Sequence, residues 1–319
     1  MKAIDCEKYG STNGLVVKEL EIPIPKNNEV QIKIYATSVH IGDTRIRRVD
    51  PFFVRLIFGL INPRENLVLG LEVSGVVSAI GKNVSKFKVG DLVFTLTGFG
   101  LGGYAEYICL PERVEEGTQE RKGLIEIKPN NLSYEESAVI PAGCLTALKN
   151  IQKTKIENNM KVMVYGASGS LGTFFIQLLK RFNVEITAVC SKKNFEIVRS
   201  LGADKLIDYT VENIYDKEDK YDIIYDAVMK INKKRVRHLL KKGGVYLNNS
   251  GLPPIVENDL YQIRRMIEDN QIKPVIDRNF VLDDIREAHK YVDSGHKVGN
   301  VSITNVNRNG ICLTIASTG

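Results

Sequence analysis

A short glycine-rich stretch carries the strongest chemical signal in this chain of 319 residues. An apolar run over 161–165 precedes it, and a helix-like run over 173–182 follows it. Glycines between a strand and a helix let a pyrophosphate approach bare backbone at the positive end of the helix dipole. The stretch therefore predicts dinucleotide binding, although similar turns also occur where nothing binds. Its members are Gly166, Ala167, Ser168, Gly169, Ser170, Leu171 and Gly172.

The residues after the next predicted strand distinguish the two nicotinamide dinucleotides. An acidic side chain at that place accepts hydrogen bonds from the ribose hydroxyls of NAD. Here the strand over 184–189 leads to Ser191, Lys192 and Lys193, with no carboxylate among them. A hydroxyl and two ammonium groups suit the 2′-phosphate of NADPH. We therefore expect NADPH as the cofactor; the alternative is that the two lysines simply begin an exposed helix.

The composition excludes several classes of protein. Lys and Arg number 44 against 38 Asp and Glu, and the longest basic cluster, over 233–237, contains no aromatic residue. We therefore expect no nucleic-acid partner. The five cysteines are far apart and form no C-x-x-C pair, which argues against disulfides or a cysteine-rich zinc site and favours a cytoplasmic location. We also expect no membrane span, because the most apolar segment, 51–61, is too short.

Two kinds of pattern divide the chain into an all-β part and an α/β part. Alternating segments over 29–36, 72–80 and 91–96 predict a small barrel. Residues 134–151 predict a helix that is interrupted near Pro141, with Ser133 as its cap ahead of Glu136. From there onward, helices alternate with strands, which predicts a parallel sheet that binds ligands at the carboxyl ends of its strands. A strand over 301–303 is expected to return to the barrel. The predicted strands of the sheet lie at 162–165, 184–189, 206–209, 223–226 and 245–247, with a helix between the last two.

Further stretches occur in the order found in a known family. They lie at 39–43, 69–77, 88–94, 103–107, 145–148, 201–204, 208–209 and 299–301. With the glycine turn, they make the chain resemble the zinc-independent, quinone oxidoreductase-like branch of the medium-chain dehydrogenase/reductases over residues 1–303. The resemblance implies an α/β protein in which a GroES-like β-barrel catalytic domain (1–127 and 280–319) flanks a Rossmann doubly wound parallel sheet (128–279). The active site would lie between them.

The resemblance also implies which residues line the two halves of the site. Candidate groups to orient a substrate are His40, Asp43 and Arg47, with Thr97 and Phe99 near the cleft. His40 could instead satisfy a backbone carbonyl, and Asp43 and Arg47 could form a structural ion pair. Around the cofactor the resemblance places Thr146, the glycine turn, Ser191 with its two lysines, Tyr209, Gly251, Lys297 and Asn300.

The residues that would bind zinc are missing from the expected places. Zinc-dependent relatives carry Gly-His-Glu where this chain has Gly70, Leu71 and Glu72, and no cysteine lies near Asp43. A catalytic zinc needs about three protein ligands, so we expect no metal. Without a Lewis acid, an activated double bond or a quinone is easier to reduce than a simple carbonyl. We therefore expect NADPH-dependent reduction of a small lipophilic quinone or an α,β-unsaturated carbonyl compound.

Two other functions compete with this reductase. One is a non-catalytic NADPH-binding protein, such as a sensor or a crystallin- or RNA-binding-like relative. The other is a zinc-dependent alcohol dehydrogenase, which would require stoichiometric zinc.

Four segments depart from the family or have open roles. Residues 113–123 form an added charged loop, and after Gly251 the chain runs directly into a helix over 256–270. We expect the sheet to lack its sixth strand, which puts a homodimer in doubt. The segment 51–61 could meet a lipophilic substrate or a membrane surface at the mouth of the cleft, or pack as an ordinary helix. The tail over 305–319 has no predicted place.

Overall fold

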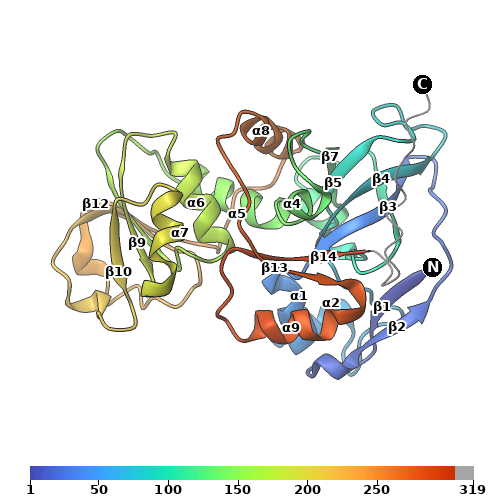
Figure 1. Ribbon diagram of the computed structural model, residues 1–319, viewed down its shortest axis with the longest axis horizontal. Coiled ribbons are helices and arrows are strands. Elements are labelled where there is room, and N and C mark those ends of the chain that lie inside the picture. Colours follow the sequence, from blue (N-terminus) through green and yellow to red (C-terminus); the bar gives the residue numbers. More distant parts are fainter. Residues whose placement is uncertain (306–319) are drawn as a thin grey trace.

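A seven-stranded sheet forms the right-hand half of the computed structural model, which describes residues 1–305 (Figure 1). The strand order is β13-β14-β3-β4-β5-β7, and β6 also pairs with β3. Side chains along β3 alternate between buried and partly exposed, as the alternating sequence predicts. The tail beyond Asn305 lies outside the described residues. The strands are β3 (Glu29–Ser38), β4 (Glu72–Ile80), β5 (Leu92–Leu96), β6 (Tyr107–Pro111), β7 (Leu124–Ile127), β13 (Ile276–Val281) and β14 (Asn300–Thr304), beside the pair β1 (Lys2–Cys6) and β2 (Leu15–Glu19).

A parallel five-stranded sheet forms the other half, in the order β10-β9-β8-β11-β12. Its central strand β8 is apolar and fully buried over 162–164, as a strand covered on both faces should be. The strand order reverses beside β8, which is where ligands bind in such sheets. Within residues 1–305 this sheet has no sixth strand, as expected. Its elements are β8 (Lys161–Tyr165), β9 (Glu185–Cys190), β10 (Lys205–Asp208), β11 (Tyr221–Asp226), β12 (Leu240–Asn248), α6 (Ser170–Leu179) and α7 (Phe195–Ser200).

The chain returns to the first sheet at its end. Strand β14 runs antiparallel to β3, and β13 runs parallel to β14. The predicted return of the strand over 301–303 is therefore confirmed. Strand β13 begins at Ile276, so the predicted domain boundary at 279/280 falls inside a strand of the barrel sheet. Helix α9 (Ile285–Asp293) connects the two strands.

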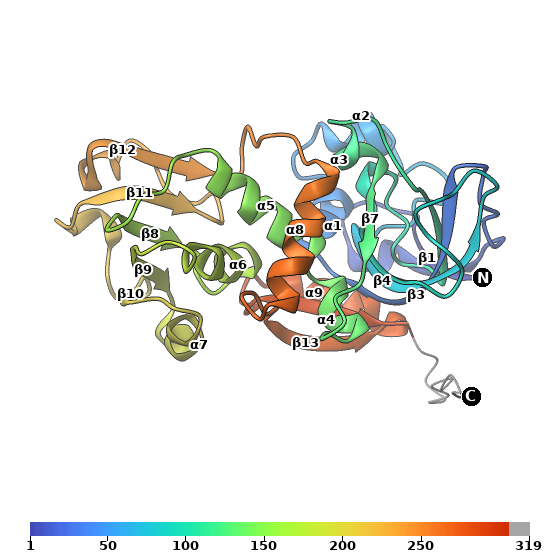
Figure 2. The same ribbon diagram turned by 90° about the horizontal axis from the view of Figure 1, so that it is seen from above.

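Helices α4, α5 and α8 lie between the two sheets (Figure 2). The helix predicted from Tyr134 breaks before Pro141 into α4 (Tyr134–Ala138) and α5 (Pro141–Gln152). Ser133 and Glu136 form the predicted capping box, since the Ser133 hydroxyl accepts from the Glu136 N–H at 3.1 Å. A buried ion pair of 2.5 Å between Lys149 and Asp259 joins α5 to α8 (Glu257–Glu268).

The prediction of a helix between β11 and β12 is wrong. Residues 227–239 form turns and end in a single 3-10 turn. The cause is Asp226, whose carboxylate accepts hydrogen bonds from the backbone N–H groups of Val228, Lys230 and Ile231 at 2.8–3.2 Å. Because a side chain satisfies these donors, the backbone forms a turn here instead of a helix. The basic cluster over 233–237 therefore lies on an exposed turn.

The remaining helices border the barrel. They are α1 (Ile41–Arg48), α2 (Val54–Phe58) and α3 (Gln119–Lys122), the last of which lies in the added charged loop. Among the described residues, no helix combines the length and the apolar character that crossing a membrane requires.

Candidate active site between the two sheets

The glycine turn connects β8 to α6 by a tight turn whose backbone conformation and close contacts require glycine. Gly166 has φ +76°, in the left-handed region, and a Cβ there would lie 2.6 Å from the Val228 side chain. In the first turn of α6, a Cβ on Gly172 would lie 2.4 Å from the Gly166 carbonyl oxygen and 2.6 Å from that of Ala167. The helix therefore packs directly against the turn at the carboxyl end of the central strand.

The N-terminus of α6 suits a bound anion. Its N-cap is Gly169, which provides no side chain to cap the first N–H groups, and the buried Ser170 hydroxyl has no partner within the described residues. Unpaired N–H groups and an unpaired hydroxyl at a helix N-terminus are typical of a pyrophosphate site. Ser168 is fixed on both sides: its hydroxyl accepts from Asn194 Nδ2 at 2.9 Å, and its carbonyl from the Gly299 N–H at 2.8 Å. The residues present therefore fit a dinucleotide.

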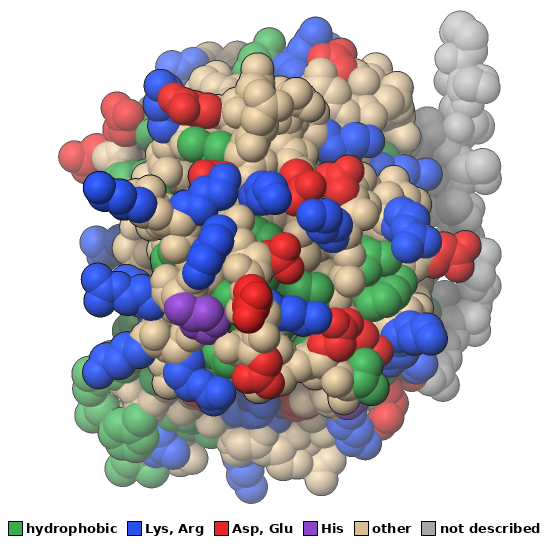
Figure 3. All heavy atoms as spheres, turned by 90° about the vertical axis from the view of Figure 1, so that its left-hand side faces the viewer, with side chains coloured by type: hydrophobic (Ala, Val, Ile, Leu, Met, Phe, Trp, Pro, Cys, Tyr) green, Lys and Arg blue, Asp and Glu red, His purple; other side chains and the backbone are tan. Residues whose placement is uncertain are grey.

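The end of β9 carries the three residues predicted to select the cofactor. Ser191 precedes a 3-10 turn, and Lys192 and Lys193 are both exposed on it. Figure 3 shows many Lys and Arg side chains at this end of the molecule, interrupted by Asp and Glu. Sequence reasoning missed Asp208, which ends the neighbouring strand β10. Hydrogen bonds, first of all from the Thr210 hydroxyl, hold the pKa of Asp208 below its ordinary value, so a carboxylate lies near these lysines.

Tyr209 follows Asp208 and is half exposed. Its ring centroid lies 6.3 Å from that of Tyr165, the last residue of β8. Both rings line a surface hollow of about 320 Å³, together with Tyr215 and residues 210–214. The structure thus places Tyr209 at the same edge of the sheet as the glycine turn.

Three of the other predicted cofactor residues also lie beside the turn. Gly299 pairs with Gly169 in an isolated β-bridge, which brings Lys297 and Asn300 alongside. Thr146 lies on α5, whose first turn contacts α6, since a Cβ on Gly143 would lie 2.6 Å from the Ser170 hydroxyl. Gly251 lies in the loop after β12, where the Lys153 ammonium group donates to the Ser250 carbonyl at 2.5 Å.

His40 offers an unengaged hydrogen-bond donor at the barrel side of the site. It caps α1, and its Nδ1 accepts from the Gly42 N–H at 3.1 Å. The proton of the neutral ring therefore lies on Nε2, and Nε2 is buried without a partner in the described residues. Burial, and then the charge of Lys297, lower the pKa of His40 to about 4. At neutral pH the ring is thus an uncharged donor.

Glu72 is the residue that sequence reasoning undervalued. It is buried at the start of β4 and accepts hydrogen bonds from the Ser38 hydroxyl and, at 2.8 Å, from the Ala142 N–H in the first turn of α5. Burial raises the pKa of Glu72 to about 7 and lowers the pKa of Lys297 to about 8, and the two charges attract each other. Glu72 therefore links the barrel to the helix that leads into the second sheet. A lone carboxylate at the start of an apolar strand was the available signal.

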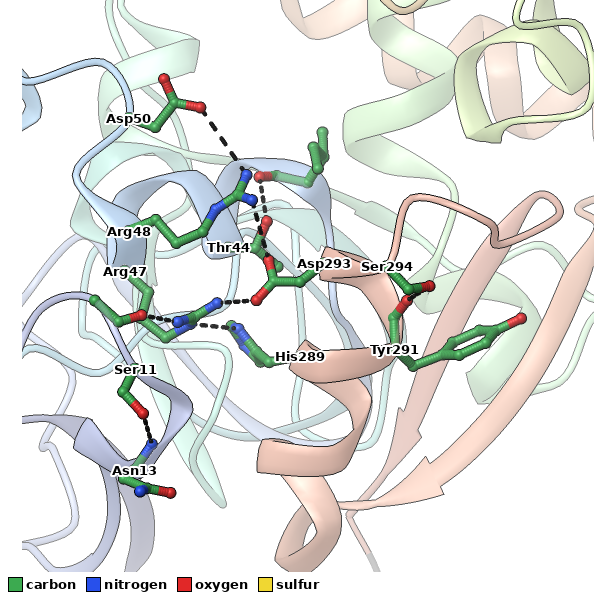
Figure 4. A network of polar contacts seen from close by, with 12 residues as sticks. Ser11, Asn13, Thr44, Arg47, Arg48, Asp50, His289, Tyr291, Asp293 and Ser294 are labelled. Carbon is green, nitrogen blue, oxygen red and sulfur yellow. Dashed lines mark hydrogen bonds and ion pairs between the residues drawn. The ribbon is translucent and has the colours of Figure 1, made fainter.

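Arg47 and Asp43 have structural positions, which corrects their assignment as groups that orient a substrate. The Arg47 side chain is fully buried, donates to His289 Nδ1 at 3.2 Å and pairs with Asp293 on α9 (Figure 4). The alternative of an ion pair between Arg47 and Asp43 is also wrong, because the partner of Arg47 is Asp293. Asp43 accepts from the backbone N–H groups of His40 and Gly70 at 2.9 and 3.0 Å. Asp43 therefore positions His40 through a hydrogen bond to its backbone.

The described residues do not fit a metal site. Within residues 1–305, no group of three His, Cys, Asp or Glu side chains could hold a metal ion. Leu71 stands where zinc-dependent relatives have a histidine ligand, and its Cδ1 would lie only 2.5 Å from a Cβ placed on Gly42. We derive no chemical step through a metal.

Comparison with known proteins decides the family. Residues 26–115 match the alcohol dehydrogenase GroES-like domain, and residues 247–302 match the zinc-binding dehydrogenase domain. The chain is 32% identical to 2-methylene-furan-3-one reductase of Solanum lycopersicum and 30% identical to an NADPH-dependent alkenal/one oxidoreductase of Arabidopsis thaliana. Each alignment covers 95% of this chain and 79% of the relative. The chain belongs to the quinone oxidoreductase-like branch of the medium-chain dehydrogenase/reductases.

Solved structures confirm the fold expected for this branch. The quinone oxidoreductase from Coxiella burnetii superposes with a TM-score of 0.82 at 22% identity, over 96% of this chain and 99% of the other. The Escherichia coli quinone oxidoreductase complexed with NADPH gives 0.78 at 20% identity, over 96% of this chain and 100% of the other. The GroES-like barrel and the Rossmann sheet of this medium-chain dehydrogenase/reductase are therefore the two halves described above.

Proposed function

We propose that this chain is an NADPH-dependent oxidoreductase that reduces quinones or α,β-unsaturated carbonyl compounds without a metal ion. The printed names of its relatives describe reductases of alkenals, enones and quinones. The observation that carries the proposal is the free, buried Nε2–H of His40, which lies near the charge of Lys297, whose segment pairs with the glycine turn at Gly299. A neutral donor in a site of low polarity suits a substrate whose oxygen becomes negative during reduction.

The chain's own residues bind and orient the cofactor. The first turn of α6 and the Ser170 hydroxyl would hold the pyrophosphate, and the ammonium groups of Lys192 and Lys193 would hold the 2′-phosphate. When bound, NADPH supplies the hydride. The segment around Lys297 lies beside the turn and closes the site from the barrel side.

Three side chains control charge around the substrate. The His40 Nε2–H donates a hydrogen bond to the carbonyl or quinone oxygen, which polarises it before reduction and stabilises the oxyanion afterwards. The Lys297 ammonium group has a pKa of about 8, so it is mostly charged at neutral pH and adds to that stabilisation. Its pKa also allows Lys297 to release a proton to the product near neutral pH. The Lys297 ammonium group donates to the Gly299 carbonyl, and the charge of Glu72 attracts it.

The decisive experiment measures NADPH oxidation by the purified chain with a panel of small quinones and enones. His40→Asn retains a side chain that can cap α1 but removes the ring N–H. We expect it to lower kcat about 100-fold while NADPH binding stays unchanged, whereas His238→Asn, on an exposed turn, has no effect. Tight NADPH binding without oxidation of any substrate would favour the non-catalytic alternative. Stoichiometric zinc by metal analysis would favour the alcohol dehydrogenase.

Cofactor selectivity has a separate test. Replacing both Lys192 and Lys193 by Ala should raise the Kd for NADPH at least about tenfold and leave the Kd for NADH almost unchanged. The exposed pair Lys233 and Lys234, changed to Ala together, is the matched control and should alter neither constant. An equal loss of affinity for both cofactors would refute the role in phosphate binding.

Oligomeric state and location stay predictions. Because the Rossmann sheet ends at β12 within the described residues, we propose that the chain does not form the homodimer of the resembled family. Light scattering of the purified chain measures this directly. Microscopy of a tagged chain tests the proposed cytoplasmic location.

A further inference from the structure

The short helix α2 and its flanks expose an unusual set of large apolar side chains. Six of them are between 53% and 82% exposed: Phe52, Phe53, Leu56, Ile57, Leu60 and Ile61, which we call the α2 patch. Only Val54 and Phe58 of this segment face the core. The segment therefore does not pack as an ordinary helix. It lies at the outer edge of the barrel half (Figure 2). Contiguous exposed apolar side chains of this size mark an interaction surface.

The backbone beneath the α2 patch is firmly held. The Arg55 guanidinium donates to the Leu60 carbonyl at 2.9 Å and lies 5.4 Å from the centroid of the Phe52 ring. The Tyr9 hydroxyl donates to the Gly59 carbonyl at 3.0 Å, and Arg64 donates to the Gly100 carbonyl at 3.3 Å. These polar groups bond within the segment and to the barrel, while the buried Arg55 Nε has no hydrogen-bond partner in the described residues. The apolar side chains project from an ordered base.

The charges around the patch indicate the kind of partner. Residues 45–65 contain five arginines and two acids, Asp50 and Glu65. Arg47 is buried and paired with Asp293, which leaves four arginines against the two acids. Arg48 and Arg64 are exposed and flank the patch in the sequence. Aromatic and aliphatic side chains bordered by arginines fit the interface of a bilayer, where apolar groups enter the acyl region and cations meet anionic headgroups.

The patch also connects to the candidate active site. Arg64 holds Gly100, which ends the 3-10 turn after Thr97, and the Thr97 N–H donates to the Leu71 carbonyl at 2.8 Å. A Cβ on Gly42 would lie 2.5 Å from Leu71 Cδ1 and 3.2 Å from His40 Nδ1. A series of contacts through Arg64, Thr97, Leu71 and Gly42 therefore leads from the patch to His40.

We propose that the α2 patch docks this protein on the surface of a membrane that contains anionic lipid. Docking rests on the patch and its arginines and requires no turnover. A failure of the reductase proposal therefore leaves it intact, and the reverse also holds.

Co-sedimentation of the full chain with lipid vesicles tests the proposal. The chain should bind vesicles of phosphatidylcholine with about 30% phosphatidylglycerol and should bind pure phosphatidylcholine much more weakly. The triple variant Phe52→Ser, Leu56→Ser, Ile61→Ser should lose affinity for the mixed vesicles at least about tenfold. The matched control changes Val17, Ile24 and Val89 to Ser, because all three are more than half exposed and lie outside the patch. The control should bind as the unchanged chain does.

Two results would overturn membrane docking. One is that the unchanged chain binds both kinds of vesicle equally well, or that the triple variant binds the mixed vesicles as strongly as the unchanged chain does. The other is that the unchanged chain is a dimer that does not bind vesicles, whereas the triple variant is a monomer. That result would assign the patch to the contact with a second copy of the chain. Melting temperature and NADPH binding, measured for each variant, verify that the fold is intact.

Discussion

Arg47 gives the sharpest test of the distinction between a catalytic and a structural residue. Its buried guanidinium contacts the Gly10 carbonyl, His289 and Asp293, and so ties α1 to α9 and to the N-terminal loop (Figure 4). Arg47→Met keeps much of the aliphatic volume but removes all three contacts. A hydrogen bond from a charged group contributes about 1.5–3 kcal/mol, and the pair with Asp293 contributes less because Asp293 is partly exposed to solvent.

Contacts within one network are not additive, so we expect a total loss of about 3–4 kcal/mol in the free energy of unfolding. At roughly 2 °C per kcal/mol for a chain of this size, the melting temperature should fall about 6–8 °C. Thermal unfolding followed by circular dichroism measures this shift. The kcat for NADPH oxidation, measured below the melting temperature of the variant, should stay within about threefold, because Arg47 touches neither the glycine turn nor the free Nε2 of His40.

Arg48→Met is the matched control. Arg48 is the last residue of the same helix, is more exposed, and lies 3.6 Å from Asp293. Its loss should cost less than about 1 kcal/mol. If Arg47→Met instead had the melting temperature of the unchanged chain and a kcat about 100-fold lower, Arg47 would be catalytic and its structural assignment would be refuted.

Two further predictions concern the turn and the buried carboxylate. Gly172→Ala brings a Cβ within 2.4 Å of the Gly166 carbonyl oxygen and should raise the Kd for NADPH, measured by calorimetry, at least about tenfold. Gly100→Ala is the control and should leave this Kd unchanged, because the space around its new Cβ is open. Equal affinities of the two variants would contradict the tight turn. Burial raises the pKa of Glu72 from 4.5 to about 7, so between these values the folded state keeps a proton that the unfolded state has released. The free energy of unfolding should therefore fall as pH rises from about 4.5 to about 7. Denaturant titrations at each pH measure this decline, and Glu72→Gln should make it shallower. The same slope against pH in the variant and the unchanged chain would contradict the raised pKa of Glu72.

Local signals in the sequence predicted much of the fold. The strand before the glycine turn, the helix after it, the capping box at Ser133 and the return of the strand at 301–303 each depend on neighbouring residues or on a simple periodicity. The absence of a sixth strand from the described part of the Rossmann sheet was likewise visible as a missing length of chain. These features depend on little beyond local patterning, which a single sequence displays.

The misses depend on contacts that hydrophobic periodicity does not show. The Asp226 carboxylate satisfies nearby N–H groups after β11, and the basic stretch that follows looked helical because its periodicity does not reveal this local contact. The partner of Arg47 lies 246 residues away on α9. The apolar segment around α2 looked equally suited to the core and to the surface, and only the fold shows that its side chains are exposed.

The charge balance of the candidate site follows from the same long-range assembly. His40, Glu72 and Lys297 come from three distant parts of the chain, and each has a pKa displaced by burial. Burial keeps His40 neutral and Glu72 partly protonated near pH 7, while Lys297 stays mostly charged. The site therefore offers the neutral His40 N–H and the Lys297 ammonium group to the substrate oxygen in weakly hydrated surroundings, which favours the negative charge that develops on hydride addition. Because Glu72 also binds the first turn of α5, the contact that joins the two halves is the one that sets this charge.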